Sequence, residues 1–149
     1  MKKQIIVTFK KNNTMKNKIL IFSFLLFTCI FYRAQVPDTL AYAKQFEANK
    51  INYIGHPFSK LLNDMTQLQP KSIWSDTNEI NTHRSGLVFN NMEDSFDIGT
   101  VHMFIFWQAP IPVTETEYYE KKNDFYFTND ERNFYGSKIV KDIYVRVTK

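Results

Sequence analysis

Cysteine is nearly absent from this chain of 149 residues, and its single occurrence lies near the amino terminus. Cys29 stands inside an apolar run that we expect to be removed. The remaining domain, residues 35–149, then has no disulfide to stabilise it and no thiol to act as a nucleophile or metal ligand. Its stability must come from a packed core, and two tryptophans, seven tyrosines and nine phenylalanines lie after residue 34 to build one.

Glycine is scarce, and the common catalytic motifs are missing with it. The four glycines are widely separated, so no glycine-rich loop can cradle a phosphate group. No serine stands in a Gly-x-Ser-x-Gly turn, and no two histidines are spaced as a zinc pair on one helix or strand. The acidic segments 93–97 and 129–131 lack the ligand pattern of a calcium loop. The sequence therefore predicts no metal and no cofactor.

Acidic residues are missing from the first 34 positions, where seven of the 19 lysines and arginines lie. Residues 35–149 therefore carry 12 basic and 15 acidic side chains, a formal charge of −3. Nucleic acids require clustered Lys and Arg that displace the counterions of the phosphate backbone. This mildly acidic domain has no basic stripe, which argues against nucleic-acid binding.

Long hydrophobic runs are also absent. The apolar run near the amino terminus, Ile19–Tyr32, has 14 residues without a charge and follows Lys16 and Lys18. A membrane-spanning helix needs about 20 apolar residues, whereas a short apolar run behind a basic segment is typical of a secretory signal. We predict a signal peptide over 1–34, cleaved after Ala34, and export to the periplasm or the outside of the cell. Residues 1–14 are interpreted as a misassigned upstream start, because Met15 begins a more ordinary signal.

Two alternatives for this run stay open. It could remain uncut as an N-terminal anchor, or Cys29 could be lipidated, although Phe27-Thr28 is a poor approach to a lipidated cysteine. If cleavage occurs, the protein meets the membrane only through the signal segment. The intact mass of the purified protein distinguishes these cases.

Two helices are expected at the start of the domain. Large apolar side chains recur at helical spacing over Asp38–Lys50. Gly55-His56-Pro57 then breaks the chain, and a second helix follows with Pro57 in its first turn. Its amphipathic stripe consists of Phe58, Leu61, Leu62 and Met65. This helix is expected to end before Pro70.

Strands are expected after residue 70. The strongest is Thr100–Gln108, where both alternating faces are mostly apolar, as in a central strand. Ala109-Pro110-Ile111-Pro112 is expected to end it, because proline cannot continue a central ladder. Asp76–Arg84 is polar and predicts a loop or turn. Other strands are expected at Ser72–Trp74, Gly86–Phe89 and Lys138–Val147, the last with Ile139, Ile143, Val145 and Val147 on one face and Lys141 as an exception among them.

The remaining segments are ambiguous. Thr114–Asn123 fits a short helix or a long loop, and Asp124–Tyr135 is undecided. Taken together, the pattern predicts an α+β fold in one domain, 35–149. Two N-terminal helices pack on a mostly antiparallel sheet of about four strands.

Of the three histidines, His83 stands in a polar stretch, where a solvated histidine is the simpler interpretation, and His56 and His102 remain the candidates for chemistry. His56 stands where the second helix begins, and a plain turn is the simpler interpretation. His102 lies in the apolar strand, where a satisfied core histidine is the simpler interpretation. The candidates for contact with a partner are Tyr118, Tyr119, Phe125 and Tyr126, since these aromatic residues stand in stretches that otherwise look exposed.

Three segments carry a resemblance to known sequences. The leader Met15–Gln35 resembles signal peptides of Flavobacteria. The segments Tyr53–Asp64 and Phe134–Ile143 are similar to parts of small exported proteins of the Bacteroidota. The resemblance implies export in such a cell and assigns no activity.

The sequence thus favours an exported, non-catalytic binding domain with a protein partner. One version is an inhibitor or immunity protein, and another is an accessory subunit of an envelope complex. The alternative is a small envelope hydrolase that uses a histidine with a carboxylate.

Overall fold

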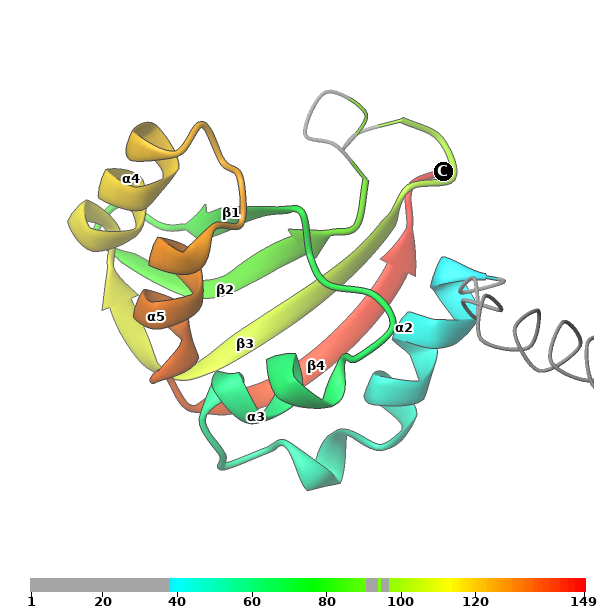
Figure 1. Cartoon of the computed structure of the whole chain (residues 1–149). Coiled ribbons are helices and arrows are strands. Elements are labelled where there is room, and N and C mark those ends of the chain that lie inside the picture. The colour runs from blue at the N-terminus through cyan, green and yellow to red at the C-terminus, as the bar shows by residue number, and fades with distance from the viewer. Residues whose placement is uncertain (1–37, 91–93, 95–96) are drawn as a thin grey trace, which may run out of the picture. The chain divides into compact units, whose positions relative to one another are not determined.

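The computed structural model describes residues 38–90, 94 and 97–149 (Figure 1). The predicted signal, Cys29 and most of the acidic segment 93–97 lie outside the described residues. Val36–Lys149 groups as one compact unit.

Four antiparallel strands form one sheet, in the order β1-β2-β3-β4. They are β1 (Ser72–Thr77), β2 (Asn81–Val88), β3 (Val101–Pro112) and β4 (Val140–Val147). The predicted α+β class and the four-stranded antiparallel sheet are confirmed.

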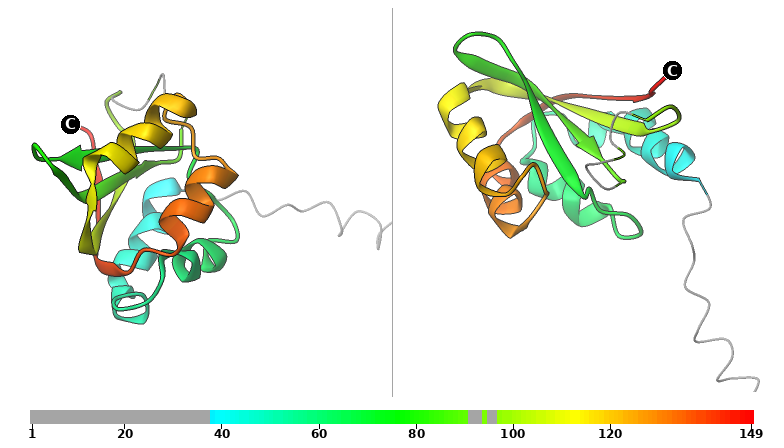
Figure 2. Two further views of the ribbon diagram at one scale, coloured as in Figure 1. Left: turned by 90° about the vertical axis from the view of Figure 1, so that its left-hand side faces the viewer. Right: turned by 90° about the horizontal axis from the view of Figure 1, so that it is seen from above.

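The helices are α2 (Thr39–Ala48), α3 (Phe58–Asp64), α4 (Val113–Lys122) and α5 (Asn129–Gly136), with the short 3₁₀ helix η1 (Lys50–Asn52) after α2. All of them lie on the same side of the sheet in both figures, which agree in three directions of view (Figures 1 and 2). The prediction of two N-terminal helices was incomplete, because two further helices, α4 and α5, lie between β3 and β4 in the sequence.

The core lies between the helices and the sheet. The stripe of α3 is buried as predicted, since Phe58, Leu61, Leu62 and Met65 are at most 1 % exposed. The Phe58 ring meets the Trp107 ring of β3 edge to face, with 5.5 Å between centroids. The Asp38 side chain accepts a hydrogen bond from Leu40 N–H (2.8 Å), which explains why α2 begins where it does.

Two of the segments singled out by resemblance, Tyr53–Asp64 and Phe134–Ile143, lie side by side. Gly55 N–H donates to Val140 O (2.8 Å), Val140 N–H donates to His56 O (3.0 Å), and Phe58 N–H donates to Lys138 O (2.9 Å). The turn before α3 is therefore bonded to the start of β4. Positive φ at Gly55 (78°) allows this turn without a steric penalty.

The predicted end of β3 was wrong, because the strand continues through both prolines to Pro112. Ile111 pairs with Thr82, and Val113 N–H donates to Ile80 O (3.1 Å). Successive backbone N–H groups of a strand point in opposite directions. Since the N–H of Val113 points toward β2, an N–H at position 112 would point away from β2. β4 pairs with β3 only as far as Trp107. Pro112 therefore removes no hydrogen bond from the sheet.

The predicted loop or turn at 76–84 is present but much shorter, because this segment also contains the ends of two strands. Asp76 pairs with Arg84 across β1 and β2, and only Asn78–Ile80 form the turn. Asn78 Oδ1 closes the turn by accepting from Ile80 N–H (3.1 Å) and Asn81 N–H (2.8 Å). The stretch is polar because Asp76 and Arg84 point to the side of the sheet that no helix of the described residues covers.

The predicted inner face of β4 needs one correction. Ile143 and Val145 are buried as expected, but a bulge pairs Phe106 with Asp142 and Trp107 with Val140. The bulge shifts the alternation by one residue. Val140 therefore points inward in place of Ile139, and Lys141 is exposed.

Candidate functional site

Both outer edges of the sheet are closed by other parts of the domain. At β1, Ile73 N–H donates to Phe125 O (2.9 Å) and Ser75 N–H donates to Glu120 Oε1 (2.7 Å). At β4, Val145 N–H donates to Glu47 Oε1 (2.9 Å), and Lys44 Nζ donates to Val145 O (2.7 Å). The pKa of Glu47 lies below its usual value. Burial alone would raise this pKa, but the hydrogen bonds that the carboxylate accepts from Lys44 and Val145 outweigh burial. These contacts leave little room for an added strand.

The face of the sheet opposite the helices carries a cluster of aromatic and arginine side chains. One residue of each strand lies in a single row across the sheet: Trp74, Gly86, Phe104 and Tyr144. We define the aromatic–arginine cluster as Trp74, Arg84, His102, Phe104, Phe106, Tyr144 and Arg146. Figure 2 shows that the described helices lie on the other side of the sheet.

Phe104 is the centre of this cluster. Its ring is 2 % exposed and lies edge to face with Trp74, at 5.5 Å between centroids. The guanidinium carbons of Arg84 and Arg146 each lie 5.1 Å from its centroid. A buried ring between two cations is a favourable cation–π arrangement.

Gly86 is required by the position of Trp74. A Cβ atom at residue 86 would lie 2.5 Å from Cε2 of the indole ring. The indole therefore lies directly on the backbone of β2, and any side chain at position 86 would displace it.

The two arginines differ in their partners. Arg84 Nε donates to Asp76 Oδ2 (2.6 Å), and this ion pair is about 40 % exposed on both sides. Arg146 is exposed, and no carboxylate of the described residues lies within ion-pair distance of it. Tyr144, two residues earlier on the same face, is 49 % exposed. The cluster thus offers a cation and an aromatic ring to solvent next to each other.

His102 belongs to this cluster. It is 1 % exposed, its ring stacks on Phe104 with 6.0 Å between centroids, and Nε2 lies 2.9 Å from Thr148 Oγ1. This environment agrees with the prediction that His102 is a buried, hydrogen-bonded histidine.

His56 lies elsewhere. It is exposed in the turn before α3, and its carbonyl accepts from Val140 N–H at the start of β4. His102 pairs with Arg146, six residues further along that strand, which corresponds to roughly 20 Å. The two candidate histidines therefore do not form one site.

The four candidate aromatic residues fall into two groups. Tyr119 stacks on Phe134 of α5 (4.4 Å), while Tyr118 is 57 % exposed beside it. Phe125 and Tyr126 are exposed along the edge of β1, and Phe125 has a φ of 62°. This left-handed conformation turns the Phe125 carbonyl toward Ile73 N–H. Tyr118, Phe125 and Tyr126 are exposed as expected, whereas Tyr119 is only partly exposed because it packs on Phe134. All four lie on the helical side or at the edge and not in the cluster.

Sequence reasoning missed the cluster as a unit. The alternation in β3 placed His102, Phe104 and Phe106 on one face. Arg84, Gly86 and Val88 alternate in the same way, but this signal was hidden by the assignment of 76–84 to a loop or turn.

Comparison with known proteins assigns no family or activity to the chain. No protein-family model, no curated protein and no solved structure matches this chain. Within the described residues, no group of three or more His, Cys, Asp or Glu side chains could hold a metal ion. No helix in that part of the chain has both the length and the apolar character needed to cross a membrane.

The carboxylate at the β1 edge gives a pH-dependent prediction. Burial raises the pKa of Glu120, which hydrogen bonds from Ser75 only partly offset. The stability that comes from its protonated form is fully present below the unfolded pKa and is lost as the pH rises through the folded pKa. We expect Glu120→Gln to raise the melting temperature relative to the unchanged protein at pH 7–8, because the amide oxygen still accepts from Ser75.

The difference in melting temperature should shrink as the pH falls toward about 4, near the pKa of an unfolded glutamate. Thermal unfolding followed by circular dichroism over this pH range measures it. Glu79→Gln, which removes an exposed acid from the β1–β2 turn, is the charge-matched control. A difference that is constant with pH would contradict the burial of Glu120 as its cause.

Proposed function

We propose that residues 35–149 form an exported, non-catalytic binding domain that docks a protein partner on the aromatic–arginine cluster. The observation that carries the proposal is the exposed Arg146 beside the half-exposed Tyr144, with no carboxylate of the described residues paired to it. Arginine and aromatic side chains are enriched among the residues that dominate binding energy at protein interfaces. The helical layer, α2 and α3 included, supports the sheet from its other face.

The chemistry of the cluster favours one kind of partner surface. Arg146 supports a carboxylate as its partner, because its guanidinium lies over Phe104 and forms no ion pair with a carboxylate of the described residues. Tyr144 and Phe106 support an apolar side chain next to that carboxylate. We therefore propose a partner that presents an acidic residue beside an apolar one.

The closed edges support docking on the face. A partner that added a strand would have to break the bonds that Glu120, Phe125, Glu47 and Lys44 make with the outer strands. An inhibitor, an immunity protein and an accessory subunit can all use such a face. The identity of the bound partner decides among them.

The test is capture of a partner by the immobilised protein from envelope and culture-fluid extracts of the source organism. Arg146→Ala is expected to weaken the binding of the captured partner by about 30-fold, which corresponds to about 2 kcal/mol. Lys141→Ala removes an exposed cation from the same strand outside the cluster and is expected to change little. The affinity should also fall with added salt, because the contact is partly electrostatic.

Gly86→Ala is the second variant, because it disturbs the cluster without removing a contact residue. The new methyl group must displace Trp74, at a stability cost of about 1–3 kcal/mol. We expect changed tryptophan fluorescence, a folded protein and loss of partner binding. Equal capture by the unchanged protein, Arg146→Ala and Gly86→Ala, or no capture at all, would refute docking on this face.

A further inference from the structure

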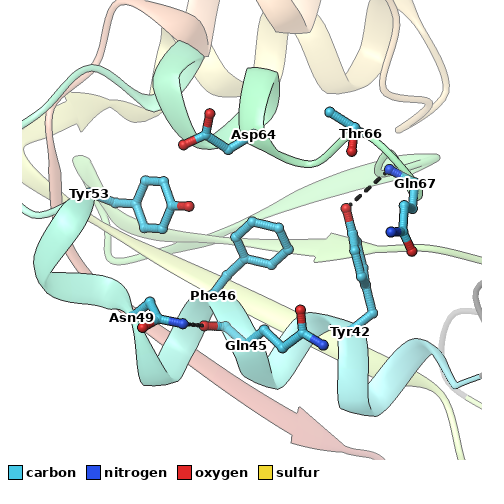
Figure 3. A pocket seen from close by; sticks show the side chains of 8 residues that line it. All are labelled: Tyr42, Gln45, Phe46, Asn49, Tyr53, Asp64, Thr66 and Gln67. Carbon is cyan, nitrogen blue, oxygen red and sulfur yellow. Dashed lines mark hydrogen bonds between the residues drawn. The ribbon is translucent and has the colours of Figure 1, made fainter.

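A separate pocket opens between α2 and the end of α3, on the helical side of the domain (Figure 3). Its volume is about 290 Å³, at the lower end of the range for small-molecule sites. A volume of this size suits a ligand of one ring better than an extended chain. The pocket is lined by Tyr42, Gln45, Phe46, Asn49, Tyr53, Asp64, Thr66 and Gln67.

Three aromatic rings line the pocket, those of Tyr42 and Phe46 from α2 and that of Tyr53 from the segment after η1. Phe46 lies between the other two, with its centroid 5.2 Å from that of Tyr42 and 6.0 Å from that of Tyr53. Each of the three residues is 8 % exposed, so the rings are held in place by the core. Fixed aromatic faces are suited to contact the C–H surface of a ring-shaped ligand.

Polar groups surround these rings, and several have hydrogen-bonding capacity left. The Tyr42 hydroxyl oxygen accepts from Gln67 N–H (3.1 Å), so its proton is free to be donated. The side chains of Gln45, Thr66 and Gln67 add amide and hydroxyl groups around the same opening, as Figure 3 shows. Burial, and secondly the negative charge of Asp64, raise the pKa of Tyr53, which keeps its hydroxyl protonated.

The charges at the pocket cancel. Asp64 is the acid of the lining, and Lys60 Nζ lies 3.6 Å from its Oδ2. The same ammonium lies 4.6 Å from the centroid of Tyr53, where an external cation would otherwise bind. Because the two charges are paired, the pocket offers no unpaired counter-charge to a cationic or an anionic ligand. The lining therefore favours a neutral, polar ligand.

We propose that this pocket binds a neutral sugar ring. The aromatic wall contacts the C–H face of the sugar, and Tyr42, Gln45 and Gln67 bond to its hydroxyl groups. This inference goes beyond the protein-binding proposal, because none of the pocket residues belongs to the aromatic–arginine cluster.

The experiment is saturation-transfer NMR of the purified protein with methyl glucoside, methyl galactoside and N-acetylglucosamine, each at millimolar concentration. Tetramethylammonium and inorganic phosphate are the charged probes. We expect transfer to at least one of the sugars and to neither ion, together with shifts of the backbone amide signals of Gln45 and Gln67.

Two variants locate the binding site. Tyr42→Phe removes a donor and keeps the ring, and Gln45→Ala removes an exposed amide. Each is expected to weaken sugar binding about tenfold, as the loss of one hydrogen bond implies. Asn63→Ala, which removes an amide of α3 outside the pocket, should leave the affinity within about twofold. Absence of sugar binding, sugar binding that both variants leave unchanged, or preferential binding of either ion would overturn the proposal.

Discussion

Replacing Tyr135 by alanine is expected to lower the free energy of unfolding by about 3–5 kcal/mol. Tyr135 is fully buried, its ring stacks on Trp107 (5.6 Å) and meets Phe134 edge to face (4.7 Å). It joins α5 to the centre of the sheet in a domain that has no disulfide. Since small domains have a total stability of about 5–15 kcal/mol, this loss would remove a large share of the stability of the domain. Urea unfolding measures the effect.

Tyr135→Phe is the matched control, because it keeps the ring and removes the hydroxyl group. That hydroxyl lies 3.3 Å from Ser75 Oγ. Burial raises the pKa of Tyr135 far above its usual range, so the group acts as a neutral hydrogen-bonding partner. The control should lose about 1 kcal/mol. If the alanine and phenylalanine variants were equally stable, the ring would not be the element that holds α5 in place.

Replacing Glu131 by alanine is expected to cost about 2–4 kcal/mol. Its carboxylate is 1 % exposed and accepts from Thr128 N–H (2.8 Å), Thr128 Oγ1 (2.6 Å) and Asn123 Nδ2 (2.7 Å). Thr128 and Glu131 form the capping box that begins α5. Without the carboxylate, the partly exposed donors of Thr128 and Asn123 lose this acceptor, and α5 loses its capping box.

Asp130→Ala tests whether this effect is specific. Asp130 is the neighbouring acid in the first turn of α5, and it forms an exposed ion pair with Lys122 (2.8 Å). An exposed pair contributes less than about 1 kcal/mol. Hydrogen exchange should show faster exchange of the α5 amides in Glu131→Ala and near-normal exchange in Asp130→Ala. Similar exchange in both variants would contradict a special role of the capping box.

The parts of the fold that could be predicted are those with strong local periodicity. The stripe of α3 and the alternation of β3 each identify an element by itself, because burial against one core imposes a regular spacing. The errors arise where the pairing with a neighbouring strand changes the regular alternation or the usual exclusion of proline. Pro110 and Pro112 are tolerated because the pairing of β3 with β4 stops at Trp107. The alternation of β4 shifts because a bulge lies opposite Phe106 and Trp107.

The candidate site was less predictable than the fold. Trp74, Arg84, Phe104 and Arg146 come from four different strands, and only the register brings them together. Nothing local marks Gly86 as the place where an indole lies on the backbone. The exposed aromatic residues Tyr118, Phe125 and Tyr126 could be anticipated from polar surroundings, but their position relative to the sheet could not.

The position of β4 has a consequence for the order in which the domain folds. β4 pairs with β3 and supplies Val140, Ile143 and Val145 to the core. Its hydrogen bonds to Lys44 and Glu47 close loops of about 100 residues. Contacts of such long separation form late and slowly. While the ribosome is still making residues 140–147, the helices and the first three strands have no complete core to join. The domain thus cannot complete its native core until β4 has been made.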